Sequence, residues 1–165
     1  MLRCLAAAAL GMLALPNALA HEASPVPDSF LVFESFPDVV GIFDSDNDTI
    51  FECLTAKRTS FDKEDKKVQY VWHLNDHNDS PQNMLTFDAE AGPSPDTYLY
   101  IEESGAARPQ VGKVYYTDYE NCAITDMFYQ GRQCILWAQV GKEDSLPEKC
   151  LKKIHAALWS RDTDI

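Results

Sequence analysis

The sequence predicts an all-β fold, an eight-stranded up-and-down antiparallel barrel followed by one C-terminal α-helix. Short segments of apolar and polar residues follow one another at even spacing, separated by turn residues. The alternation is clearest at Val68, Tyr70, Trp72 and Leu74, which fall on one face of a strand. Such a barrel closes its own edges and can hold one small ligand, although this periodicity also fits a β-sandwich.

The first 20 residues have the pattern of a secretory signal peptide. Arg3 precedes an apolar run, and Ala18-Leu19-Ala20 supplies small residues for cleavage. We therefore expect residues 1–20 to be a signal and 21–165 to be one barrel domain that is secreted into the extracellular space. After a Pro-rich lead-in over 21–28, residues 29–37 are long enough for a short helical turn.

The strands follow in order along the chain. We expect them at 39–44, 50–59, 68–74, 83–89, 97–102, 111–118, 121–129 and 133–140. The last two form a hairpin across Gln130-Gly131. A two-residue turn there would place Cys122 opposite Gln139 and Cys134 opposite Met127, so that Cys122 and Cys134 are out of register with each other.

A single amphipathic helix is predicted after the last strand. Ser145 and Glu148 have the spacing of a capping box. The apolar face of this helix carries Cys150, Ile154 and Ala157 on one stripe, widened by Leu151, Leu158 and Trp159. Cys150 therefore faces the barrel, within reach of a cysteine on a strand.

Charge and composition exclude several classes of partner. Without Arg3 the chain has 13 basic residues against 26 acidic ones. This surface repels nucleic acid and anionic lipid, and it favours cationic partners. No apolar stretch after the signal approaches the roughly 18 residues of a membrane span, so we expect no membrane association. We also expect a monomer.

Four cysteines remain once Cys4 leaves with the signal: Cys53, Cys122, Cys134 and Cys150. In an oxidising compartment this even number favours disulfides over metal or redox chemistry, and none of the spacings is C-x-x-C. Asn47 and Asn78 lie in glycosylation sequons, which fits an exported protein.

Three segments resemble a known family. Residues 118–124 read Asp-Tyr-Glu-Asn-Cys-Ala-Ile, residues 134–137 read Cys-Ile-Leu-Trp and precede Cys150, and residues 50–54 place Cys53 in a strand. Together with the signal, they resemble the tick salivary lipocalins of the histamine-binding type over most of the chain. In that family the segment near Cys122 carries an Asp and the segment near Trp137 carries a Glu, and both acids line the amine site. Here Ala123 and Ile135 stand at those positions.

The resemblance implies a Cys122–Cys150 disulfide. It offers no partner for Cys53, because the family's further cysteine near the chain end has no counterpart here. Cys53 and Cys134 either form the remaining pair or are two thiols. The resemblance also places Trp137 and Ile135 inside the barrel.

The ligand-binding candidates are aromatic residues, Ile135 and two acids. Tyr70, Trp72, Tyr98, Tyr100 and Trp137 can supply ring contacts to a cation, and Glu102 and Asp118 are the acids that would replace the missing carboxylates. The resemblance implies a secreted protein that sequesters histamine or serotonin and so evades host defence. The alternatives are a lipid mediator such as an eicosanoid or fatty acid, favoured by an apolar cavity, or a filled barrel that binds a host protein through its surface.

Metal, cofactor and enzyme chemistry find little support. The acidic run that begins at Asp44 lacks the Gly and Glu that a calcium loop needs. His73 and His77 have no third ligand at a suitable spacing. No G-x-S-x-G, H-E-x-x-H or phosphate-binding glycine loop is present. We therefore predict a binding protein with no cofactor and no catalytic residues.

Overall fold

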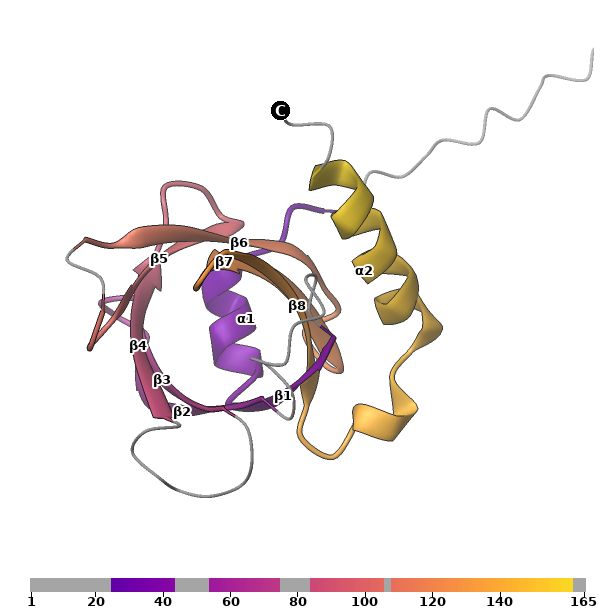
Figure 1. Ribbon diagram of the computed structural model, residues 1–165, viewed down its shortest axis with the longest axis horizontal. Coiled ribbons are helices and arrows are strands. Elements are labelled where there is room, and N and C mark those ends of the chain that lie inside the picture. The colour runs from indigo at the N-terminus through magenta and orange to yellow at the C-terminus, as the bar shows by residue number, and fades with distance from the viewer. Residues whose placement is uncertain (1–24, 44–53, 75–83, 106–107, 162–165) are drawn as a thin grey trace, which may run out of the picture.

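A closed antiparallel barrel confirms the predicted fold class and excludes the sandwich. The computed structural model describes residues 25–43, 54–74, 84–105 and 108–161. Eight strands pair in sequence order, and β8 returns to β1 to close the ring (Figure 1). The strands are β1 (Asp38–Phe43), β2 (Thr55–Asp62), β3 (Lys67–His73), β4 (Met84–Ala91), β5 (Thr97–Glu102), β6 (Gln110–Thr117), β7 (Cys122–Phe128) and β8 (Arg132–Gln139).

The helix α1 (Ser29–Ser35) closes one end of the barrel, where the sequence indicated only a helical turn. Asp28 caps it, and its carboxylate accepts hydrogen bonds from the backbone N–H groups of the first turn at 2.9 Å. At the other end of α1, the Arg58 guanidinium donates to the carbonyls of Phe33 and Glu34. In the view down the barrel, α1 lies inside the ring of strands (Figure 1).

The barrel interior is filled by alternate residues of the strands. On β3 the residues Val68, Tyr70 and Trp72 are buried and the residues between them are partly exposed, as the sequence predicts. Their cross-strand neighbours on β2 and β4 include Ala56 and Phe87, which are also buried. Strand parity therefore decides which side chains reach the interior.

A second, smaller core lies outside the barrel. The helix α2 (Glu148–Arg161) packs against β6, β7 and β8, and Figure 1 shows it beside the ring. Cys122 and Cys150 form a disulfide with Cα atoms 6.3 Å apart, which confirms that pairing. The second core consists of Tyr116, Cys122, Ile124, Cys134, Leu136, Cys150, Ile154 and Ala157.

Two local expectations are wrong. The structure pairs Cys122 with Ala138 and Cys134 with Asp126, one residue away from the predicted register. The reason is that Tyr129, Gln130 and Gly131 form a three-residue connection, in which Gln130 (φ 51°) and Gly131 (φ 139°) are both left-handed. The capping box is also absent: Ser145 ends the short 3₁₀ helix η2 (Glu143–Ser145), and α2 begins at Glu148.

Several sequence features lie outside the described residues. These are the signal peptide, both sequons at Asn47 and Asn78, Cys53, His77 and the acidic run from Asp44. The Cys53–Cys134 pair and glycosylation therefore stay predictions. Within the described ranges, none of the helices has the length and apolar character needed to cross a membrane.

Candidate functional site

An aromatic cavity occupies the barrel interior. Its volume is about 80 Å³. Phe33 of α1 and Phe36, which caps the C-terminal end of α1, both line it, so this segment forms the floor of the cavity. The full lining is Val32, Phe33, Phe36, Val39, Ala56, Tyr70, Trp72, Phe87, Ala89, Tyr98, Tyr100, Ala123, Thr125, Met127 and Trp137.

The rings of the cavity wall pack in T-shaped and tilted pairs. The Trp72 ring centroid lies 5.1 Å from that of Trp137 in a T-shaped arrangement and 4.7 Å from that of Phe87. Offset and T-shaped ring pairs at these separations add stabilisation beyond area burial. The indole N–H of Trp137 donates to the Thr125 hydroxyl at 2.9 Å, so it is satisfied inside the wall. The rings of Trp72, Phe87 and Trp137 therefore lie together in one part of the cavity wall.

The tyrosine hydroxyls of the cavity are already hydrogen-bonded to backbone. Tyr70 donates to the Phe36 carbonyl at 2.6 Å, which ties β3 to the end of α1. Tyr100 donates to the Phe128 carbonyl at 2.9 Å and accepts from its N–H at 2.6 Å. Burial raises the pKa of Tyr70, Tyr98 and Tyr100 above the ordinary tyrosine value. These side chains are therefore neutral, and the hydrogen bonds that their hydroxyl groups donate link neighbouring segments of the wall.

Tyr98 crosses the inner surface of a neighbouring strand. It projects from β5, lies over Gly112 of β6 and donates to the Asp126 carbonyl of β7 at 3.3 Å. A Cβ at position 112 would overlap the Tyr98 ring. Glycine is required there by this close approach.

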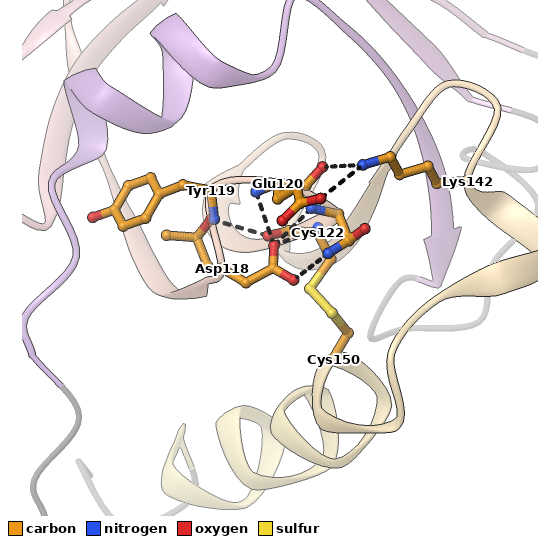
Figure 2. Close-up of a disulfide and its surroundings, with 8 residues drawn as sticks. Asp118, Tyr119, Glu120, Cys122, Lys142 and Cys150 are labelled. Carbon is orange, nitrogen blue, oxygen red and sulfur yellow. Dashed lines mark hydrogen bonds and ion pairs between the residues drawn. A yellow bond between two sulfur atoms is a disulfide. The ribbon is translucent and has the colours of Figure 1, made fainter.

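The two candidate acids lie away from the cavity lining. Glu102 is at the end of β5, where it accepts a hydrogen bond from Ser104 in the following turn. Asp118 lies in the β6–β7 turn beside the disulfide (Figure 2). Among the described residues that line the cavity, none is acidic.

Asp118 organises the turn that carries Cys122. Its Oδ1 accepts from the backbone N–H groups of Glu120, Asn121 and Cys122 at 2.7–3.1 Å (Figure 2). Burial would raise the pKa of Asp118, but the hydrogen bonds from Asn121 and the three backbone groups outweigh it, so the pKa is lowered. The carboxylate thus fixes the start of β7 and the position of the disulfide.

The other residues predicted to contact the ligand fall into two groups, those that line the cavity and one that is buried in the barrel core. Tyr70, Trp72, Tyr98, Tyr100 and Trp137 all line the cavity, as does Ala123 at the family's Asp position. Ile135 is buried in the barrel core but does not line the cavity.

Sequence reasoning missed Phe33, Phe36, Phe87 and Met127. The alternation over 83–89 was the available signal for Phe87, which the structure pairs across the strands with Tyr70. Nothing in the sequence of 29–37 indicated that its phenylalanines enter the barrel.

No usable metal site results from the described residues. Asp118, Cys122 and Cys150 bring ligand atoms within 4.8 Å of one another. Both sulfurs are joined in the disulfide and carry no thiolate to offer a metal. His73 has no histidine, cysteine or carboxylate cluster around it in the described part of the chain.

The closed eight-stranded barrel, its helical floor and its aromatic cavity define a lipocalin-type ligand-binding protein. The solved structure of apocrustacyanin C1 shares the fold with a TM-score of 0.52 and 15% sequence identity, covering 85% of this chain and 82% of that one. The profile of the tick histamine binding protein family matches residues 43–161. The chain belongs to this family, which supports small-ligand binding. A search of curated proteins finds no significant match.

Proposed function

We propose that the protein is a secreted carrier that binds one small host mediator inside its barrel, without turnover. The cavity carries this proposal, because aromatic rings make up much of its lining and α1 lies at one end of it. Family membership and the absence of the motifs of catalysis support stoichiometric capture. In saliva at a feeding site, such capture would blunt the host response and so evade defence.

A biogenic amine, histamine or serotonin, is the ligand class we favour. The cavity of about 80 Å³ has less room for an acyl chain than for an amine, which is the smaller of the two ligand classes. The rings of Trp72, Phe87 and Trp137 can contact an aromatic ligand and, by cation–π attraction, contribute up to about 2 kcal/mol to an ammonium group. The net charge of −12 attracts cations to the protein.

The chemistry of the lining favours a second candidate, a lipid mediator. A buried ammonium group without a carboxylate partner loses its hydration at a cost of several kcal/mol, roughly. Ala123 and Ile135 replace the acids of the family, and Glu102 and Asp118 do not restore one in the lining. An acyl chain needs no such partner. It would need more room than the present volume, since ligand pockets usually measure about 300 Å³ or more.

The small volume also supports the third candidate, a filled barrel that acts through its outer surface. One titration separates the three. Histamine, serotonin and arachidonate are added to the protein, and binding is followed by calorimetry and by the fluorescence of Trp72 and Trp137. Ala123→Leu adds three carbon atoms inside the cavity. Ala156→Leu makes the same change on the exposed face of α2 and is the matched control.

We expect an amine to bind the native protein and the Ala156→Leu variant, and to bind Ala123→Leu at least tenfold more weakly. Binding of arachidonate alone would select the lipid carrier. If no ligand binds, or if Ala123→Leu binds as tightly as the native protein, the interior is not the ligand site and the surface candidate replaces it.

A further inference from the structure

The helix α2 has a charge opposite to that of the rest of the protein. Residues 148–161 contain Lys149, Lys152, Lys153 and Arg161 against Glu148 alone. The other 151 residues contain ten basic and 25 acidic residues. The net charge of the protein would repel anions, but the positive charge of α2 can attract an anion locally. Such a surface indicates a binding site for an anionic partner.

Three of these lysines share one face of the helix. Lys149, Lys152 and Lys153 stand at positions i, i+3 and i+4, which are neighbours on a helical surface. Lys149 and Lys152 are exposed, and Ala156 continues the same face with a small side chain. We call this surface, Lys149, Lys152, Lys153 and Ala156, the lysine face.

Two of the three lysine side chains lie over one tyrosine ring. The ammonium groups of Lys149 and Lys153 each lie 5.7 Å from the centroid of the Tyr116 ring. Neither has a carboxylate within 4.0 Å in the described part of the chain. Lys152 pairs with Glu148 at 2.8 Å, an exposed contact that salt and water weaken. Two like charges thus share one ring, an arrangement that an added anion would stabilise.

The apolar side of α2 is unavailable to a membrane. Cys150, Ile154 and Ala157 are buried against the barrel, and the disulfide to Cys122 fixes them there. A helix that lies in a bilayer interface needs a free apolar face. The exposed large apolar residue of α2 among its described side chains is Leu151, which lies outside the lysine face.

We propose that the lysine face binds a linear sulfated polysaccharide. Clusters of basic residues of this length are typical of heparin-binding patches. A narrow, flexible polyanion can lie along α2 without approaching the acidic surface of the barrel. An anionic bilayer or a stiff nucleic acid is more extended and would also approach that acidic surface, which repels it. Such binding would retain the carrier at a sulfated extracellular matrix, independently of what fills the cavity.

The test measures the affinity of the purified protein for heparin, with unsulfated dextran, phosphatidylserine vesicles and duplex DNA as comparisons. Each lysine neutralised releases counterions, so three contacts give a slope of log affinity against log salt of about −2 to −3. We expect Lys149→Gln, Lys152→Gln and Lys153→Gln together to lower heparin affinity at least tenfold at about 0.1 M salt. The three corresponding Lys→Arg changes keep the charge and the binding.

The matched control removes the same charge from the β2–β3 turn, with Lys63→Gln, Lys66→Gln and Lys67→Gln. It should bind heparin within twofold of the native protein, because acidic residues are interspersed in that turn. An equal loss in both triple variants would show a net-charge effect and overturn the proposal, as would no loss in the α2 variant. Tighter binding to the vesicles or to DNA than to heparin would also overturn it. Ultraviolet circular dichroism establishes that each variant is folded.

Discussion

Removing the Cys122–Cys150 disulfide should destabilise the protein by about 3 to 4 kcal/mol. The bond joins residues 28 apart in sequence. Closing a loop of that length lowers the entropy of the unfolded chain by roughly 12 cal/mol/K, which is about 3.6 kcal/mol at 25 °C. Both cysteines are fully buried, so the loss of packing adds to this value in Cys122→Ala/Cys150→Ala.

Urea unfolding of the native protein and of Cys122→Ala/Cys150→Ala, followed by tryptophan fluorescence and circular dichroism, measures the difference. The loss should be largest in α2, because Ile154 and Ala157 are then its main remaining buried contacts with the barrel among the described side chains. Hydrogen exchange should therefore report faster exchange in 148–157 than in the strands of the barrel.

A loss of stability below about 1 kcal/mol would refute this reasoning. It would mean that packing alone holds α2 on the barrel and that the disulfide restricts the unfolded chain little. The double variant also tests the remaining cysteines. If Cys53 and Cys134 form a disulfide, a reducing agent lowers the stability of the double variant further. If they are two thiols, the reducing agent has no effect on it.

Three further perturbations test the site and its surroundings. Gly112→Ala should destabilise the protein by about 1 to 3 kcal/mol, because its Cβ displaces the Tyr98 ring; the cost should largely disappear in a Tyr98→Ala background, and an equal cost in both backgrounds contradicts this account. Asp118→Asn should destabilise by about 1 kcal/mol at pH 7. The folded-state pKa of Asp118 lies below its unfolded value, so its charge stabilises above the unfolded pKa and this contribution disappears as the pH falls through the folded pKa. A gap in urea midpoint that persists unchanged at pH 2 would contradict the assignment. Ala123→Asp restores an acid at the family's position: it should cost more stability at pH 8 than at pH 4, because a desolvated carboxylate resists ionisation, and it should strengthen histamine binding in calorimetry. Unchanged histamine affinity would show that the residue does not face the ligand.

The strands could be predicted from the sequence because they carry the two-residue alternation that sheet geometry imposes, although this alternation does not distinguish a barrel from a sandwich. Tyr70 and Trp72 show this alternation. The inward placement of Trp137 and Ile135 came from the family resemblance, and both belong to the barrel core. The β7–β8 register could not be predicted, because it depends on the left-handed backbone of Gln130, a residue with no strong preference for it.

The sequence predicted the aromatic residues that the strands contribute to the cavity. It did not predict the contribution of α1 or the absence of an acidic residue among the described lining residues. Five predicted aromatic residues line the cavity, because each lies on an inward position of a strand. The contribution of Phe33 depends on where a seven-residue helix docks, which is a tertiary contact without a local signal. Asp118 and Glu102 sit at strand ends, where parity no longer decides direction, and their carboxylates are engaged in turns.

The floor of the barrel is a separate segment from its wall. α1 is attached to the strands through a few polar contacts, those of Arg58 and Tyr70 among them, while its phenylalanines set the depth of the space above. Changes in the size of Phe33 or Phe36 would thus deepen or fill the chamber and leave all eight strands in place. Related proteins with this scaffold can therefore bind ligands of different length through substitutions in one short N-terminal segment. The closed sheet need not change.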